Sequence, residues 1–217
     1  MTKYNKYTQY KTVDIKQRDW PNNSLNKCPI WCSVDLRDGN QALAEPMDSV
    51  RKMKFFKKLI EVGYKEIEVG FPSASDTDFN FIRELINDGH IPDDVTIQVL
   101  TQSREELIIK TIDSLKGSKN AIIHLYNSTS TLQRKVVFKE DMNGVKKIAT
   151  DGAKIISDNI GILNNTNVRL EYSPESFTGT ELPYALEVCE EVLDVWEANE
   201  LKPVIINLPA TVEMSSP

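Results

Sequence analysis

A short run of charged and amide side chains, residues 33–41, is the part of the sequence best suited to chemistry. It contains Arg37 and Asp38, and two amide side chains follow at Asn40 and Gln41. A carboxylate such as Asp38 can ligate a hard divalent cation, which prefers oxygen ligands. A guanidinium can stabilise negative charge that develops on a substrate oxygen. The pair also has a purely structural interpretation, because an Arg–Asp ion pair often does no more than close a loop.

Polar side chains also follow the other predicted strands, at the point where each strand ends. In an α/β barrel or a doubly wound sheet these ends meet at one edge, where the chemistry takes place. An acid, a base, a cation and several amides at that edge would suit a small anionic substrate. The residues that we expect there are Arg37, Asp38, Asn40, Gln41, Glu68, Ser73, Leu100, Thr101, His124, Asn127, Ser173, Glu175, Asn207 and Thr211.

Some of these residues have simpler interpretations. His124 stands alone on an apolar strand, which is typical of a hydrogen-bonded core histidine. Glu175 could cap the helix that follows it, and Thr211 could be a turn residue. The sequence contains no glycine-rich phosphate loop, no G-x-S-x-G elbow and no H-E-x-x-H helix. The strand-end residues therefore remain the main candidates for a site.

Hydrophobic periodicity places strands and helices in regular alternation around these residues. This pattern predicts an α/β protein whose parallel sheet is built from right-handed crossovers. A complete barrel of this kind needs about 250 residues, so we predict a (β/α)8 TIM barrel truncated after about six βα units. The expected strands are 29–36, 65–71, 95–100, 121–126, 168–172 and 203–208, and the expected helices are 47–62, 79–86, one between 103 and 117, 142–163 and 182–199.

The domain organisation follows from where this alternation begins. Residues 1–27 show no sustained period and are predicted to be an N-terminal arm, whose tyrosines pack on the domain or on a partner subunit. Residues 28–217 are predicted to be an incomplete TIM-barrel catalytic domain, because the chain reaches its end in a loop after the sixth strand.

Local patterns add detail to two of the helices. In the helix at 47–62, apolar residues recur at helical spacing, and the basic residues, Lys52 among them, take the opposite face, where we expect them to be exposed. Gly63 is expected to end that helix. Ser103 and Glu106 have the spacing of a capping box, which predicts that Ser103 caps the next helix.

Composition limits the class of protein. The 217 residues are 40% hydrophobic and 27% charged, as in a globular domain, and the net charge of −6 with no long basic run gives no support for nucleic-acid binding. The apolar runs are far shorter than the roughly 20 residues of a membrane-spanning helix. The polar N-terminus lacks an apolar signal core, which predicts a cytoplasmic protein. Cys28, Cys32 and Cys189 are expected to be reduced thiols.

Five segments carry motifs more specific than any periodicity. They are WCSVDLRDGNQAL at 31–43, EVGFPSAS at 68–75, HLYNSTS at 124–130, EYSPESF at 171–177 and NLPATVEM at 207–214. In this order and at this spacing they resemble the 2-isopropylmalate synthase family. The resemblance implies a TIM-barrel acyltransferase that joins the acetyl group of acetyl-CoA to 2-oxoisovalerate, by Claisen-type condensation and thioester hydrolysis, in the committed step of leucine biosynthesis. It also implies a divalent metal (Mg²⁺, Mn²⁺ or Zn²⁺) and a homodimer of the full-length protein.

The same resemblance assigns roles to individual residues. Asp38 is similar to a metal ligand, and Arg37 is similar to the catalytic residue that stabilises the oxygen that becomes negative on attack. Glu175 resembles a catalytic member of the polar network. No residues are assigned to acetyl-CoA. The residues that resemble the keto-acid pocket are Arg37, Leu100, His124, Ser173 and Thr211.

The sequence also departs from the family pattern. In the family, a His-x-His pair on a later strand completes the metal site, whereas this sequence has only His90 and His124. The family pattern also includes a linker and a leucine-sensing domain, which we expect to lie beyond Pro217. We therefore expect this chain alone to bind metal weakly and to be inactive. Two alternatives stay open: a homocitrate or citramalate synthase of the same fold, against which the 124–130 segment argues, and a non-catalytic remnant that binds or oligomerises through its arm.

Overall fold

A computed structural model describes residues 27–212 of the chain. The chain divides into two compact units, Met1–Ile30 and Trp31–Pro217, and every described helix and strand belongs to the second unit. The predicted N-terminal arm at 1–27 lies, except for its last residue, outside the described residues. Among the described helices, none is both long and apolar enough to span a membrane.

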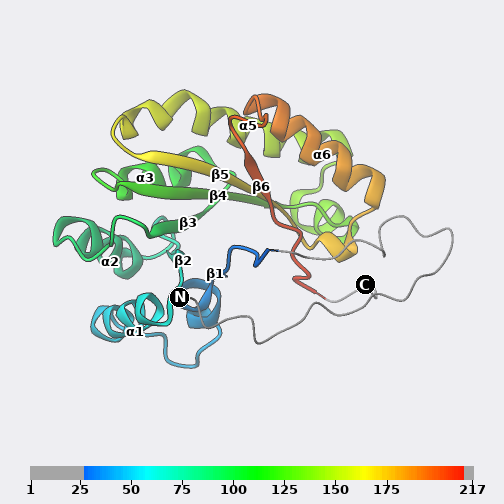
Figure 1. Ribbon diagram of the computed structural model, residues 1–217. Helices are drawn as coiled ribbons and strands as arrows, with labels where there is room; N and C mark the ends of the chain where they lie inside the picture. The colour runs from blue at the N-terminus through cyan, green and yellow to red at the C-terminus, as the bar shows by residue number, and fades with distance from the viewer. Residues whose placement is uncertain (1–26, 213–217) are drawn as a thin grey trace, which may run out of the picture. The chain divides into compact units, whose positions relative to one another are not determined.

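The second unit is built on a parallel sheet whose strands follow one another in chain order, from β1 at one edge to β6 at the other (Figure 1). Each strand therefore pairs with its neighbour in sequence, and the sheet curls into part of a barrel, as predicted. The strands are β1 (Cys32–Ser33), β2 (Glu66–Gly70), β3 (Thr96–Gln102), β4 (Asn120–Ser128), β5 (Asn167–Glu175) and β6 (Val204–Ile206).

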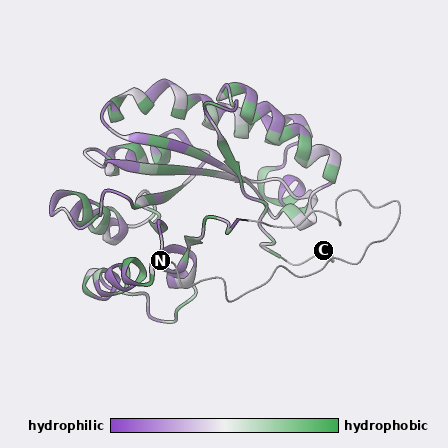
Figure 2. Ribbon diagram, in the orientation of Figure 1, coloured by the Kyte–Doolittle hydropathy of each residue, from purple (hydrophilic) through white to green (hydrophobic). Residues whose placement is uncertain are grey.

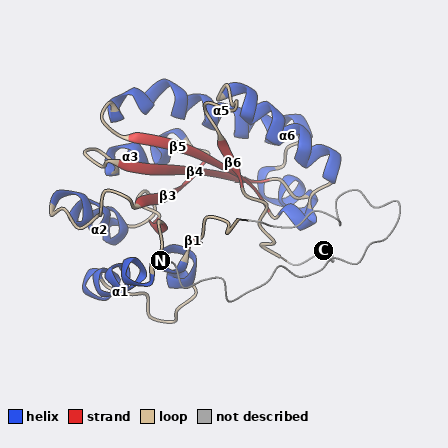
Figure 3. Cartoon of the chain, viewed as in Figure 1, coloured by secondary structure: helices blue, strands red, loops and turns tan. Residues whose placement is uncertain are grey.

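Helices connect the strands and cover one face of the sheet (Figure 3). They form a row, because α1 packs on α2, α2 on α3, α3 on α5 and α5 on α6. The long helices are α1 (Ser49–Val62), α2 (Asp76–Asn87), α3 (Glu105–Ser114), α5 (Met142–Asn159) and α6 (Leu182–Val195). The short ones are η2 (Asp35–Gly39), α4 (Thr131–Gln133), η3 (Arg134–Phe138), η4 (Ile160–Leu163) and η5 (Phe177–Gly179).

The hydrophobic core lies between this row of helices and the sheet. Successive side chains of a strand point to opposite faces, so on β2 the buried Ile67 and Val69 face the helices and belong to the core. Phe56 of α1 and Phe81 of α2 fill the same core from the other side. Figure 2 shows the resulting mixture of hydrophobic and hydrophilic residues along each helix and strand. The opposite, concave face of the sheet is left for polar side chains.

The first strand is much shorter than the predicted 29–36. Only Cys32 and Ser33 pair with β2, because the chain then turns into the single-turn π-helix η2. The backbone N–H groups of Arg37, Asp38 and Gly39 all donate to the carbonyl of Val34, so the chain leaves the extended conformation at this point. The prediction of a long buried strand at 29–36 was wrong. The apolar residues before β1, such as Trp31, which is 65% exposed, are not buried.

Helix α1 follows the prediction closely and departs from it at one residue. It ends at Gly63, whose φ of 111° is in the left-handed region that favours glycine. Lys52, however, is fully buried and forms an ion pair with Asp78 of α2, so its predicted exposure was wrong. Asp78 in turn accepts a hydrogen bond from the backbone N–H of Phe71 at 2.8 Å, which ties the end of β2 to the helix layer.

The capping box predicted at Ser103 and Glu106 does not form. The residue before α3 is Arg104, which makes no side-chain capping bond. The hydroxyl of Ser103 instead donates to the backbone carbonyl of Ile148 in α5. Ser103 therefore joins the loop between β3 and α3 to α5 and does not cap α3.

Candidate active site

A cavity of about 590 Å³ opens at the carboxyl ends of the strands. In parallel α/β folds this edge of the sheet is where ligands bind. Every residue that the sequence predicted for the metal, the catalytic groups or the keto-acid pocket contributes to its lining. The lining residues are Val34, Arg37, Asp38, Gln41, Phe71, Leu100, His124, Tyr126, Ser173, Glu175, Asn207, Pro209, Ala210 and Thr211.

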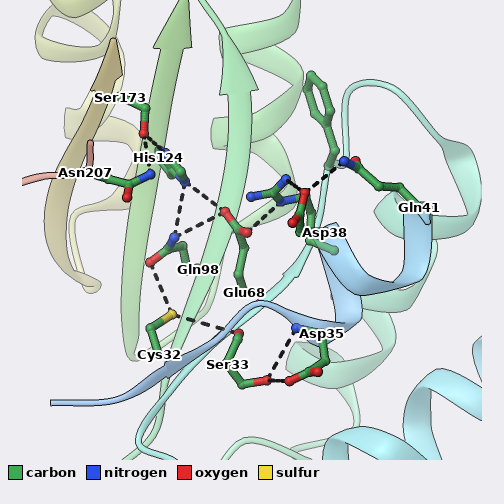
Figure 4. A network of polar contacts seen from close by, with 12 residues as sticks. Cys32, Ser33, Asp35, Asp38, Gln41, Glu68, Gln98, His124, Ser173 and Asn207 are labelled. Atoms are coloured by element: carbon green, nitrogen blue, oxygen red, sulfur yellow. Dashed lines mark hydrogen bonds and ion pairs between the residues drawn. The ribbon is translucent and has the colours of Figure 1, made fainter. Parts of the chain in front are cut away.

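Arg37 and Asp38 enter the cavity from η2, directly after β1. The Arg37 guanidinium donates through Nη1 to Asp38 Oδ1 at 2.8 Å and through Nε to Glu68 Oε2 at 2.6 Å. Gln41 donates to the same Asp38 oxygen at 2.9 Å (Figure 4). Asp38 remains 56% exposed, whereas Glu68 is completely buried beneath the cavity. The π-helix therefore places the Asp38 carboxylate at the opening of the cavity, whereas the guanidinium of Arg37 is held in the interior by Glu68.

His124 lies at the centre of the concave face, on β4. Its Nδ1 is 2.8 Å from Glu68 Oε1, and its Nε2 is 2.6 Å from the Ser173 hydroxyl (Figure 4). Nε2 is also 3.4 Å from Glu171 Oε1, and Asn207 donates to the Ser173 hydroxyl at 2.7 Å. The core-histidine interpretation is thus correct in that the ring is buried and hydrogen-bonded, yet the ring also lines the cavity.

Glu175 and Thr211 form the rim of the cavity over β5 and β6. The hydroxyl of Ser128, at the end of β4, donates to Glu175 Oε2. The Thr211 hydroxyl oxygen accepts from the backbone N–H of Ser176 at 3.1 Å, which leaves its proton available to a ligand. Leu100 is a buried apolar residue in the wall of the cavity.

The electrostatics of the concave face differ from one carboxylate to the next. Burial by itself would raise the pKa of Glu68, but the hydrogen bond and charge of His124 and the charge of Arg37 outweigh that effect and lower it. Burial raises the pKa of Glu171, and the nearby charge of Glu68 raises it further, against the opposing effect of His124. Glu68 and Glu171 both lie beside the His124 imidazole, yet their pKa values are shifted in opposite directions.

Five of the strand-end residues expected at the site do not line the cavity, and one of them is Glu68, which lies buried beneath it. Asn40 accepts a hydrogen bond from the backbone N–H of Met47, and Asn127 accepts one from the hydroxyl of Tyr172 on the helix side of the sheet. Thr101 is buried and also points to the helix side, because successive side chains of a strand alternate and its neighbour Leu100 points into the cavity. The hydroxyl of Ser73 accepts a hydrogen bond from the hydroxyl of Thr111 in α3.

Other lining residues were not predicted from the sequence. Tyr126 lies two residues after His124 on β4 and therefore shares its face. Its ring packs edge-on against Phe71, with ring centroids 6.1 Å apart. Burial and the nearby charge of Glu175 raise the pKa of its hydroxyl. Strand periodicity alone was sufficient to place Tyr126 beside His124.

The described residues do not form a complete site for a divalent metal. Asp38 supplies one exposed carboxylate oxygen donor, which suits a hard cation. No group of three or more His, Cys, Asp or Glu side chains able to hold an ion exists between residues 27 and 212. The three cysteines are free thiols, as predicted, and burial raises the pKa of Cys32 to about 12, which disfavours it as a ligand.

The curled parallel sheet and the cavity at its carboxyl edge define an α/β protein of the TIM-barrel class. Within this class, the model of the HMGL-like family matches residues 28–217. The chain therefore belongs to the HMGL-like family.

Relatives with assigned names are similar over almost the entire chain. The 2-isopropylmalate synthase of Parafrankia sp. (strain EAN1pec) is 62% identical over 213 residues, which are 98% of this chain and 38% of that enzyme. The 2-isopropylmalate synthase of Clostridium acetobutylicum is 57% identical over 216 residues, or 99% of this chain and 39% of that enzyme. The chain thus spans less than two fifths of the length of these relatives.

Among solved structures, an HMG-CoA lyase from Acinetobacter baumannii, in complex with coenzyme A and 3-methylmalate, has a similar fold. It aligns with a TM-score of 0.58 at 14% identity and covers 85% of this chain and 57% of the lyase. At this identity the likeness concerns the fold alone, and it agrees with a sheet that forms part of a barrel.

Proposed function

We propose that this chain is the N-terminal part of the catalytic domain of a 2-isopropylmalate synthase. The full-length enzyme would join the acetyl group of acetyl-CoA to 2-oxoisovalerate, and water would then hydrolyse the thioester and release CoA, in leucine biosynthesis. The observation that supports this most strongly is the gathering of Arg37, Asp38, His124, Ser173 and Glu175 around one cavity, in a chain 62% identical to an enzyme of that name.

The residues of the cavity would divide the work of this reaction. The acetyl methyl carbon attacks the ketone carbon, and the ketone oxygen becomes negative as the new bond forms. Arg37 supplies a fixed cation for that oxygen, because Glu68 already holds its guanidinium in place. Glu175 offers a carboxylate for proton transfer, and the bond from Ser128 sets its direction.

The keto acid would lie against the remaining wall. Leu100 provides apolar surface for its isopropyl group, and the Thr211 hydroxyl has a proton to donate to its carboxylate. A divalent metal, when bound, would polarise the ketone, with Asp38 as one ligand. The other ligands must come from outside the described residues, so we propose that this chain alone binds metal weakly.

Acetyl-CoA-dependent thiol release tests this proposal. We expect the full-length protein that carries this chain to release CoA with 2-oxoisovalerate and a divalent metal, and to prefer that acid to pyruvate or 2-oxoglutarate. We expect no release from the 217-residue chain alone. A preference for one of the other acids would indicate a citramalate or homocitrate synthase. No release with any of the three acids would contradict the enzyme assignment. We further propose that the full-length protein is a cytoplasmic homodimer.

A further inference from the structure

Glu68 is completely buried directly beneath the cavity and uses both of its carboxylate oxygens. Oε2 accepts from Arg37 Nε at 2.6 Å, and Oε1 lies 2.8 Å from His124 Nδ1. Oε1 also accepts from the side-chain amide of Gln98 at 3.1 Å. One carboxylate therefore contacts two residues that line the cavity, although Glu68 itself does not line it.

The short contact to His124 determines where the imidazole carries its proton. An ionised carboxylate can only accept hydrogen bonds, so a 2.8 Å contact with Nδ1 requires a proton on Nδ1. The neighbouring amide of Gln98 does not compete as an acceptor. Its oxygen faces the Cys32 thiol at 3.7 Å, so its nitrogen donates to Glu68 Oε1 at 3.1 Å. The same nitrogen lies 3.2 Å from Nδ1 and could donate only to an unprotonated Nδ1, but the contact of Nδ1 with the Glu68 carboxylate is shorter and charge-assisted, and therefore the stronger of the two. Against the effect of burial, the hydrogen bond from His124 and the charge and hydrogen bond of Arg37 lower the pKa of Glu68, which is consistent with an ionised carboxylate beside a neutral ring.

A proton on Nδ1 leaves the other nitrogen of a neutral ring as an acceptor. Nε2 is 2.6 Å from the Ser173 hydroxyl, which itself accepts from Asn207 at 2.7 Å, whereas Glu171 Oε1 is farther from Nε2, at 3.4 Å. The Ser173 proton is therefore directed at the ring. Figure 4 shows the contacts that connect Asn207, Ser173, His124 and Glu68. With the ring proton on Nδ1, each of these groups donates to the next in that order.

We propose that Glu68 is the positioning residue of this site, which keeps the ring proton of His124 on Nδ1 and holds the guanidinium of Arg37 from the same carboxylate. The position of the proton does not depend on any activity of the chain. The link between this proton and keto-acid binding rests on the proposed function, which makes the cavity a keto-acid pocket. A merely structural Glu68 would neutralise charge without selecting a tautomer.

Nitrogen NMR of the imidazole tests the proposal on the 217-residue chain itself. The sequence has only two histidines, so the substitution H90Q assigns the remaining signals to His124. Two-bond and three-bond ¹H–¹⁵N correlations at about pH 8 distinguish the two neutral tautomers and the doubly protonated ring. We expect the Nδ1–H form alone in the unsubstituted chain. A ring that carries its proton on Nε2, or on both nitrogens, overturns the proposal before any variant is made.

The variant E68Q tests whether the carboxylate is the cause. A neutral amide can donate to Nδ1 as well as accept from it, so we expect the His124 nitrogen signals to shift towards the Nε2–H form. Glu66 offers a matched control, since it lies two residues earlier on the same face of β2 and pairs with Arg169 away from the cavity. We expect E66Q to leave the His124 signals unchanged. Unchanged signals in E68Q, or equal shifts in both variants, would show that Glu68 does not select the tautomer and has only a structural role. Neither result bears on thiol release, so the proposed function stands or falls separately.

Discussion

The two faces of the sheet are both buried, yet different forces stabilise them. On β2, Ile67 and Val69 point towards the helices and pack into an apolar core, whereas Glu66 and Glu68 point to the concave face and are ion-paired. Apolar packing needs only the right volume and pattern. Buried charges need each partner in place, and they add little net stability because desolvation offsets their attraction. We infer that the helix face stabilises the fold and that the concave face is arranged for chemistry.

One ion pair lies on the apolar side and tests this division most severely. Lys52 is 0% exposed and its partner Asp78 is 14% exposed. There is no space for a side chain at Gly70 next to them, because an added Cβ would lie 2.8 Å from the Asp78 carboxylate. This pair therefore joins α1, α2 and the end of β2 in one small region.

Removal of the Lys52 ammonium should have the largest effect of the substitutions considered. We expect Lys52→Ala to lower the free energy of unfolding by about 3–5 kcal/mol, because it leaves Asp78 as an unpaired, largely buried charge. Denaturant unfolding would measure the change. The control is Lys58→Ala, which breaks an exposed pair with Glu61 in the same helix and should cost at most about 1 kcal/mol. Equal effects of the two substitutions would mean that the buried pair is dispensable.

A cation on the concave face should instead matter mainly for activity. We expect Arg37→Gln in the full-length protein to lower kcat by about 10²–10³-fold, as removal of a preorganised charge stabiliser does. Arg169→Gln is the matched control, since Arg169 pairs with Glu66 on the same face but does not line the cavity. Its kcat should stay within about threefold of the unsubstituted enzyme. A similar loss in both variants would show that the fold, and not the site, had been damaged.

The helix face was the part of the fold that the sequence predicted well. Period-two and helical patterns placed β2 to β6 and the long helices correctly, because their apolar residues are buried where the pattern requires. Composition misled at β1, where Trp31 is apolar but exposed. Lys52 was mispredicted for the opposite reason, since helical spacing gives no sign of a buried partner on another helix.

The site was predictable at its rim and less so in its interior. Arg37 follows β1 and Glu175 ends β5, where the rule for parallel sheets applies. His124 and Glu171 lie in register in the middle of β4 and β5, and Gln98 lies two residues before Leu100 on β3. The polarity of Gln98 and Glu171 was not recognised as part of the site. Alternation shows that such residues share a face, but only the curvature of the sheet decides that this face is an interior one.

The two glutamates beside His124 should give opposite dependence of stability on pH. The lowered pKa of Glu68 means that the native state binds fewer protons than the unfolded state below its ordinary value of 4.5. Its contribution is therefore present above that pH and lost as the pH falls through the folded-state pKa. The raised pKa of Glu171 means that the native state holds a proton longer, so stability is lost as the pH rises from 4.5 through the folded-state pKa.

Glutamine substitutions separate these two contributions. At neutral pH we expect Glu68→Gln to cost about 1.5–3 kcal/mol, because it weakens hydrogen bonds to a charged group. We expect Glu171→Gln to cost less and to flatten the loss of stability above pH 4.5, since glutamine resembles the protonated carboxyl. Denaturant unfolding between about pH 3 and pH 8 would measure both. Parallel pH profiles of the two variants would contradict the assigned directions.

The smallest expected effect comes from two identical neighbours on β4 that face opposite ways. Ile122 and Ile123 are both 0% exposed, but only Ile123 belongs to the apolar core. Ile122 lies in register between Gln98 and Arg169 on the concave face. We expect Ile123→Val to cost about 0.5–1.5 kcal/mol, the usual range for one buried methylene. Ile122→Val should cost less, because polar neighbours with longer side chains can close the space. Denaturant unfolding of both variants under the same conditions compares the two faces with the chemistry of the substitution held constant. An equal cost would show that the concave face is packed as tightly as the core, and that its polar residues contribute to stability as well as to the site.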